Sequence, residues 1–178
     1  MYKIGHLVLS SSPYVSVLNR THRQTRCDFC FKQLNCENKF TCEVCECVSY
    51  CSDRCKDHDQ ADHESECCYL SCTTSDTVRL MIRLMGKERK EDDGESLPDG
   101  SKRKLKHLLD HKEQIRVNEK AIDKIGQTYN LLMKCNYEHL PDFDEFSSLF
   151  GKVLINGFTV SDLSENNIAT GDLIYMQT

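Results

Sequence analysis

The sequence predicts an α+β fold in which a small cysteine-rich module precedes a mostly helical region with a few short strands. Three observations lead to this prediction. Eight cysteine and histidine residues fall in four close pairs within residues 27–67, apolar residues then recur at helical spacing, and a β-branched run begins at Val153. Helices repeat every 3.6 residues and strands every two, so the spacing of apolar residues distinguishes them.

Residues 1–20 predict an N-terminal strand and turn. Val8 to Ser10 leads into a segment around Pro13 that proline keeps extended. A strand this short is no domain, and its open backbone edge needs a partner. We expect it to pair with a later segment of the chain or with a segment outside it.

The four pairs have the spacing of metal ligands. Two are Cys-x2-Cys pairs, which suit a tight turn presenting two thiolates to one metal, and two are spaced i,i+4, one turn apart on a helix face. Eight nitrogen or sulfur donors complete two tetrahedral sites, so the predicted fold is zinc-stabilised. The ligands are Cys27, Cys30, Cys42, Cys45, Cys51, Cys55, His63 and Cys67.

Twelve cysteines also suit the disulfide framework of a secreted protein. Against that alternative, the N-terminus offers only the short apolar run from Ile4 to Leu9, which is interrupted by His6 and is no signal peptide. No apolar run approaches the roughly 20 residues of a membrane span. We therefore expect zinc, no membrane association, and a reducing compartment, the nucleus or the cytoplasm.

Four further cysteines are interpreted as spare thiols: Cys36, Cys47, Cys68 and Cys72. Cys47 lies two residues after Cys45 and would make a poorer turn with the preceding ligand. Cys68 follows His63 by five residues, which takes it off the shared helix face. His58 is interpreted as a solvated helix residue.

Helices are predicted after the cysteine-rich module. Ser75 is a suitable N-cap, and a stripe at i, i+3, i+4 and i+7 follows it at Val78, Met81, Ile82 and Met85. Residues 87–104 are charged and carry glycine and proline, which indicates a mobile loop.

A helical pattern resumes near Leu105 and continues to about His139, with a stripe at Ile122, Ile125, Tyr129, Leu132 and Met133. Asp142 is expected to start another helix. Its buried residues are predicted to be Phe143, Phe146, Phe150 and Val153. The run from Val153 to Val160 then predicts a helix-to-strand junction, in which Asn156 satisfies nearby backbone groups.

The order of the ligands resembles the MYND zinc finger. The one histidine is the seventh of eight ligands, Tyr50 precedes Cys51, and seven residues separate Cys55 from His63. The resemblance implies interleaved metals: Cys27, Cys30, Cys51 and Cys55 hold zinc 1, and Cys42, Cys45, His63 and Cys67 hold zinc 2. It also implies protein partners, including proline-rich peptides. Where the family usually has tryptophan, this chain has Gln60.

The segment K-I-G-H-L-V-L-S-S-S-P-Y-V at residues 3–15, followed by R-C-D-F-C at 26–30, is similar to the start of SET-and-MYND (SMYD) proteins. These are protein-lysine methyltransferases whose finger is inserted into a split SET domain. The resemblance implies a SET strand at 1–20, the finger at 27–67, a helical SET insert at 73–152, and the start of the C-terminal SET portion at 153–178.

The resemblance also implies a place for S-adenosylmethionine. The family has an N-x-F-T-I segment like that at Asn156, whose asparagine lies in the cofactor pocket. The family's G-R-G and N-H-S-C runs do not occur in these 178 residues, so we expect truncation at both ends and no assigned catalytic residue. One hypothesis is an interaction module that does not methylate. The alternative is a partial record of an active methyltransferase acting on histone or other lysines.

A DNA-binding finger is a third alternative. The net charge of −5 opposes it, and Arg54 with Lys56 make a thin basic footprint. We also expect the finger to fold independently, because metal binding supplies its folding free energy. Residues from Ser75 onward are expected to be loosely packed, since they lack the sheet that their helices should cover.

Overall fold

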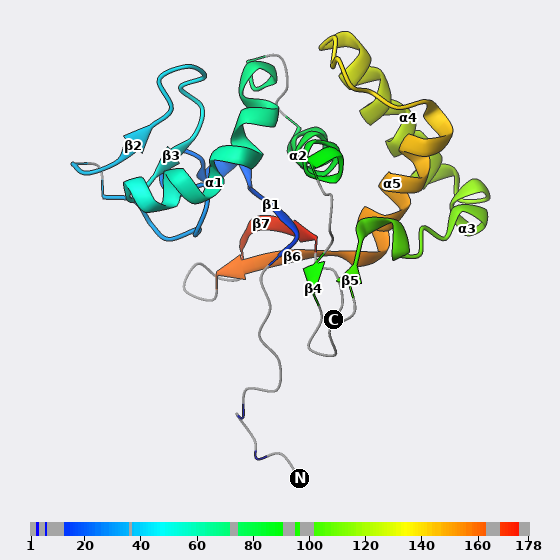
Figure 1. The fold of residues 1–178 in the computed structure, drawn as a ribbon, viewed down its shortest axis with the longest axis horizontal. Coiled ribbons are helices and arrows are strands. Elements are labelled where there is room, and N and C mark those ends of the chain that lie inside the picture. Colours follow the sequence, from blue (N-terminus) through cyan, green and yellow to red (C-terminus); the bar gives the residue numbers. More distant parts are fainter. Residues whose placement is uncertain are drawn as a thin grey trace.

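The computed structural model describes residues 3, 6, 13–35, 37–71, 75–90, 95–96, 102–162 and 168–174. Figure 1 shows the cysteine-rich finger at one side, helices α3 to α5 at the other, and α2 between them. The elements are β1 (Val15–Leu18), η1 (Arg20–His22), β2 (Phe40–Thr41), β3 (Ser49–Tyr50), α1 (Asp53–Glu66), η2 (Cys67–Tyr69), α2 (Asp76–Lys90), β4 (Glu95–Ser96), β5 (Lys102–Arg103), η3 (Leu105–His107), α3 (Lys112–Arg116), α4 (Glu119–Lys134), α5 (Phe143–Asn156), β6 (Gly157–Asp162) and β7 (Ile168–Ile174). This is the expected α+β arrangement of a cysteine-rich module and a mostly helical region.

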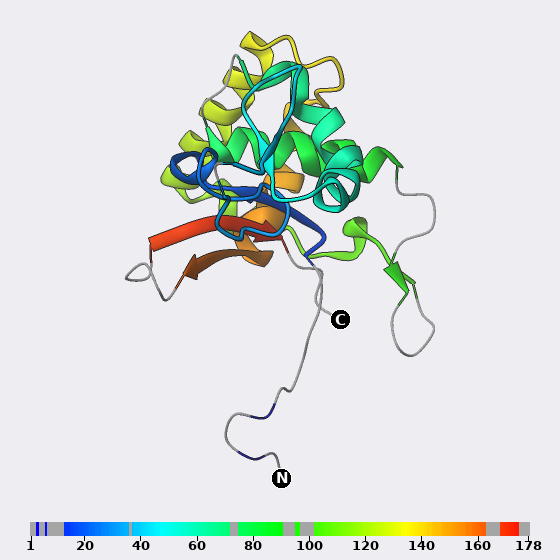
Figure 2. The ribbon, with the colours of Figure 1, turned by 90° about the vertical axis from the view of Figure 1, so that its left-hand side faces the viewer.

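An antiparallel sheet in the order β1-β7-β6 joins the two ends of the described chain. Val15 in β1 and Gly157 in β6 both pair with Ile174 in β7. The first strand therefore has the partner that its open edge required, and that partner lies later in the chain. The strand begins at Val15, while the predicted segment from Val8 to Ser10 lies outside the described residues. Figure 2 shows the sheet running beneath the helices.

Helix α2 is the centre of the fold. Ser75 Oγ accepts a hydrogen bond from the backbone N–H of Val78 at 3.3 Å, as the predicted N-cap requires. The predicted stripe is buried, but so are all nine residues from 78 to 86, two arginines included. The helix contacts α1, β1 and α4. Neighbours on several sides explain why its burial exceeds that of an amphipathic surface helix.

The segment predicted as the loop 87–104 contains regular structure. Helix α2 continues to Lys90, and β4 pairs with β5 through Glu95 and Arg103. Lys87 Nζ lies 4.7 Å from the centre of the Tyr14 ring, and Lys90 Nζ donates to the Ala61 carbonyl at 3.0 Å. These contacts give the charged side chains partners, so the helix extends past the predicted boundary. Residues 91–94 and 97–101 of the predicted loop lie outside the described part of the chain.

Helix α5 begins at the predicted N-cap. The Asp142 carboxylate accepts hydrogen bonds from the backbone N–H groups of Asp144 and Glu145 at 3.0 and 2.9 Å. Phe146 and Phe150 are fully buried, as predicted. Phe143 was also predicted to be buried, but 46% of its surface is exposed. Its ring contacts Tyr129.

Helix α4 differs from its predicted pattern in two respects. It ends at Lys134, five residues before the expected boundary at His139. Ile125 and Leu132 are buried, but Ile122 and Met133 are 42% and 56% exposed. The buried stripe is therefore narrower than predicted.

Two apolar clusters form among the described residues. Eighteen buried residues from β1, α2, α4, α5 and their connections make the larger one, and Cys27, Val48, Tyr50 and Leu70 make the smaller one in the finger. The region from Ser75 onward is therefore well packed. The expectation of loose packing was wrong because α2, α4 and α5 bury apolar residues against one another and against β1. No helix in the described ranges has the length and apolar character needed to cross a membrane.

Candidate metal centre

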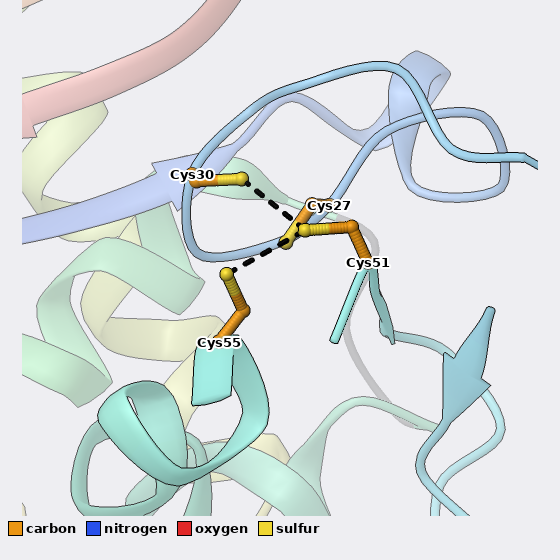
Figure 3. A group of neighbouring side chains, drawn as sticks. All are labelled: Cys27, Cys30, Cys51 and Cys55. Carbon is orange, nitrogen blue, oxygen red and sulfur yellow. Dashed lines mark hydrogen bonds between the residues drawn. The ribbon is translucent and has the colours of Figure 1, made fainter. Parts of the chain in front are cut away.

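The first group of donors joins a turn to the start of α1. Cys27 and Cys30 lie on a turn in which the Phe31 N–H donates to the Cys27 carbonyl at 3.0 Å and Phe31 adopts a left-handed φ of 61°. Cys51 and Cys55 lie at the N-terminus of α1. The helix start is fixed by Ser52, whose side-chain oxygen accepts from the backbone N–H of Cys55. Figure 3 shows the four sulfur atoms converging from these two segments.

The second group repeats this design. The Glu46 N–H donates to the Cys42 carbonyl at 2.9 Å, and Glu46 has a left-handed φ of 54°. Cys42 and Cys45 thus lie on a turn like that of the first group. Their partners are His63 near the C-terminus of α1 and Cys67, which caps it. Each Cys-x2-Cys turn faces one end of α1, so the two groups interleave along the chain.

The distances between donors fit zinc. In each group the four donor atoms lie within 4.8 Å of one another. The sulfur atom of Cys51 lies 3.6 Å from that of Cys30 and 3.6 Å from that of Cys55. In the second group, Cys42 Sγ lies 3.8 Å from Cys67 Sγ. Zinc–sulfur bonds of about 2.3 Å in a tetrahedron place neighbouring sulfurs about 3.8 Å apart. The geometry and the thiol–imidazole chemistry of both groups therefore suit zinc.

The thiols of the second group differ in acidity before metal binds. Burial raises the pKa of Cys67 to about 12, and the neighbouring thiols of Cys42 and Cys45 add to the increase. Burial also opposes ionisation of Cys42. Hydrogen bonds to the Cys42 sulfur outweigh this effect of burial and lower the pKa of Cys42 to about 6. They come first from the backbone N–H of Cys45 and then from the His63 side chain. Zinc needs thiolates, so its binding at neutral pH is expected to release protons.

No protein-family model matches the chain. It is 28% identical over 171 residues to histone-lysine N-methyltransferase ASHR1 of Arabidopsis thaliana, covering 90% of this chain and 34% of that protein. It is 27% identical over 171 residues to N-lysine methyltransferase SMYD2-A of Danio rerio, covering 90% of this chain and 37% of that protein. It is also 27% identical over 179 residues to histone-lysine N-methyltransferase SMYD3 of Mus musculus, covering 94% of this chain and 40% of that protein. The chain is SMYD-like. It spans between about a third and two fifths of the length of these relatives.

The spare cysteines of this SMYD-like chain lie outside both donor groups where the structure describes them. Cys68 is exposed, and the Cys47 backbone N–H points at Cys45 Sγ at 3.5 Å. Cys36 and Cys72 lie outside the described residues. His58 is exposed and stacks on the Phe29 ring with centroids 5.4 Å apart, so it is no member of either group.

Asn156, the predicted cofactor contact, is the last residue of α5. Its side-chain amide donates to the Lys152 carbonyl of the same helix at 2.8 Å, which is the local backbone role considered in the sequence. A pocket of about 270 Å³ lies beside the junction, lined in part by Val153, Gly157 and Phe158. Asn156 is not among its lining residues.

A set of buried charged residues beside the metal groups was not predicted from the sequence. Arg79 and Arg83 of α2 are buried together with Asp28, Asp59 and Glu66 of the finger. Two signals were available: arginines four residues apart among the apolar residues of one helix, and acids placed next to ligands in the sequence. Buried charges are rare unless paired, so these positions required partners.

Proposed function

We propose that residues 27–67 form a two-zinc finger of the MYND type that acts as a protein-interaction module attached to a SET-like body. The observation that carries this proposal is the meeting of two interleaved groups of four donors at tetrahedral spacing. The chain supplies all four donors to each group, which leaves no open position for a substrate. Closed sites of this kind are structural, so the zinc ions would stabilise a binding surface.

Metal stoichiometry tests the metal part of the proposal. Native mass spectrometry of the reduced protein is expected to find two zinc ions per chain. Cys45→Ser removes a donor and should leave one ion, whereas Cys47→Ser should leave two because its backbone N–H, which is retained, makes the contact to Cys45. One zinc or none in the unsubstituted chain would overturn the proposal, and the opposite pattern in the variants would mean that the ligands are wrongly assigned.

The surface of the finger supports a role in protein binding. Phe29 and Phe40 are 40% and 39% exposed, and Val44 is 82% exposed. Aromatic residues are enriched at protein interfaces, so these exposed apolar side chains are the positions at which we propose that a partner binds. By its resemblance to the MYND family, the partner is a protein segment, with proline-rich peptides as the first class to test. Reduced thiols are required, so we propose that the protein works in the nucleus or the cytoplasm.

A matched pair of variants tests the binding role. Val44→Ser on the finger and Val117→Ser on the connection before α4 each replace a valine that is 82% exposed. Titration of a proline-rich peptide library should show binding that is weakened by the first substitution and unchanged by the second. Zinc content serves as the folding control. Equal loss in both variants, or peptides that bind only after zinc removal, would contradict an interaction surface on the finger.

Methyl transfer is the second candidate, because the relatives above are named lysine methyltransferases. We propose that it is not a property of these 178 residues by themselves. The Asn156 amide is already used by its own helix, and a net hydrogen bond contributes about 0.5–1.5 kcal/mol. Micromolar affinity for S-adenosylmethionine needs about 8 kcal/mol.

Calorimetric titration of S-adenosylmethionine into the purified chain, beside a radiolabelled methyl-transfer assay on histones and other proteins, tests this second proposal. We expect weak or no binding and no transfer. Micromolar binding that Asn156→Ala abolishes would show that these residues build a working cofactor pocket.

A further inference from the structure

A buried ionic cluster joins α2 to the finger. Its members are two guanidinium groups and three carboxylates, which gives one surplus negative charge. The residues are Arg79, Arg83, Asp28, Asp59 and Glu66, none more than 2% exposed. The arginines come from the helical body and the acids all come from the finger, so the cluster is the charged part of the contact between them.

The two arginines share their acids. Arg79 donates from Nε to Glu66 Oε2 at 2.7 Å and from Nη1 to Asp28 Oδ1 at 3.0 Å. Arg83 donates from Nε to Glu66 Oε1 at 2.8 Å and from Nη2 to Asp28 Oδ2 at 2.8 Å. Glu66 and Asp28 are therefore each held by both guanidinium groups. Asp59 accepts from Arg83 and from the Tyr50 hydroxyl, at 2.8 Å in each case. Fork-shaped contacts of this kind fix the orientation of a carboxylate.

Glu66 also faces a donor of the second metal group. His63 directs Nε2 toward that group, 3.7 Å from Cys45 Sγ. Its other ring nitrogen, Nδ1, is buried, and Glu66 Oε1 lies 3.5 Å from it. Among the described residues, Nδ1 makes no hydrogen bond, and the Glu66 carboxylate is within ion-pair distance of it. A histidine that ligates through Nε2 carries its proton on Nδ1, where a carboxylate fixes the tautomer and the ring orientation.

We propose that Glu66 is a positioning residue for the second metal group, and that Arg79 and Arg83 couple the metal affinity of that group to the packing of α2. This inference rests on the zinc binding proposed above. The arginines orient Glu66, Glu66 orients His63, and His63 ligates. Coupling between two sites is reciprocal, so metal in the second group should also stabilise α2 against opening.

The first metal group provides an internal comparison. Asp28 lies between its ligands Cys27 and Cys30 and pairs with the same arginines, but all four donors there are cysteines. A thiolate has no second ring nitrogen for a carboxylate to orient. A change at Glu66 should therefore act on the second group far more than on the first.

The test is competition between the full chain and a chelator, with Co²⁺ as the probe because S₄ and S₃N sites differ in their absorption spectra. Glu66→Gln keeps the shape of the side chain and removes its charge. We expect metal affinity to fall about 10- to 100-fold at the S₃N group and to stay unchanged at the S₄ group. Glu64→Gln is the matched control, since Glu64 is exposed on the same helix and accepts only from Gln60 among the contacts described.

Arg83→Lys tests the coupling to α2. Lysine keeps the charge but loses the fork that binds Glu66 and Asp59, so metal affinity at the S₃N group should fall although no donor has changed. Slow amide exchange in α2 should become faster when the second group alone loses its metal. Arg116→Lys, at an exposed site on α3, should alter neither quantity.

Nitrogen NMR of the unsubstituted, zinc-loaded chain keeps the inference testable if Glu66→Gln does not fold. His63 should show a metal-bound Nε2 and a protonated Nδ1 that exchanges slowly. Ligation through Nδ1, or equal loss of metal from both groups in Glu66→Gln, would overturn the inference. If the chain binds two metals and their affinities do not change in Glu66→Gln, only this inference is refuted. If the chain binds no metal, the proposed function is refuted.

Discussion

The finger and the helical body differ in what holds them together. The apolar cluster of the finger has four buried residues, one of them a metal-group cysteine, and its other neighbours are mainly partly buried cysteines. The cluster of the body has eighteen buried residues, including Phe146, Phe150 and Leu132. Ordering each residue costs conformational entropy, which the body offsets by apolar burial. The finger is too small to do so and needs metal bonds instead.

The contact between the finger and the body depends neither on apolar burial nor on metal bonds, because charged groups form it. Arg79 and Arg83 reach out of the apolar helix α2 and meet the acids of the finger. Removing one partner of a buried ion pair leaves an uncompensated charge, at a cost of about 3–5 kcal/mol. The expectation that the finger folds independently therefore remains a prediction. The charged contact argues against it, because the buried acids of the finger take their cationic partners from α2.

Metal removal should have the largest effect and should separate the two regions. A chelator is expected to unfold the finger, because each structural zinc site contributes about 10 kcal/mol or more in model peptides. Amide exchange should become fast across residues 27–67. Helices α4 and α5 should keep most of their protection, since their buried residues lie in the cluster of the body. Protection in the finger that survives the chelator would show that its apolar cluster suffices without metal.

Phe146→Ala should produce the next largest effect and act on the body. The Phe146 ring is fully buried, with its centroid 5.2 Å from that of Tyr129 and 6.0 Å from that of Phe150. Its loss should lower the free energy of unfolding of the body by about 3–5 kcal/mol, measured by urea denaturation followed by circular dichroism. The two bound zinc ions should remain. Phe143→Ala is the control, because its 46% exposed ring should cost far less.

The features that the sequence predicts well are local ones. Pair spacing identified the eight candidate donors, because two ligands on one turn or one helix face are set by the backbone geometry alone. Their division into two interleaved groups was implied by the resemblance to the MYND finger. The caps at Ser75 and Asp142 depend on neighbouring residues in the same way. The pairing of β1 with β7 was left open, since nothing in either segment specifies a partner so distant in the chain. The Arg79–Glu66 contact escaped notice for the same reason, because it exists only once the finger and α2 meet.

Gly86→Ala tests how closely the two regions approach. A Cβ atom at Gly86 of α2 would lie 2.7 Å from Ser65 Cβ of α1, which is closer than real Cβ atoms come. Because α1 would have to move away, we expect a loss of about 1–3 kcal/mol in stability. Metal affinity at the second group should fall as well, since His63 lies on the displaced helix. Unchanged stability in thermal unfolding would indicate that α1 and α2 are less tightly apposed than the structure places them.

Gly126→Ala is the smallest expected effect and has the opposite sign. Gly126 lies in the interior of α4, and a Cβ atom there would meet nothing within 4 Å. Alanine restricts the unfolded chain and favours a helix interior over glycine by about 0.5–1 kcal/mol. The substitution should therefore raise the stability of the body by about that amount while leaving the zinc content and metal affinity of the finger unchanged. The change in stability is measured by thermal unfolding of Gly126→Ala and Gly86→Ala side by side. Both variants add one methyl group to a helix, but only α4 has room for it. A loss of stability in Gly126→Ala would mean that this face of α4 is covered in solution by a contact that the described residues do not make.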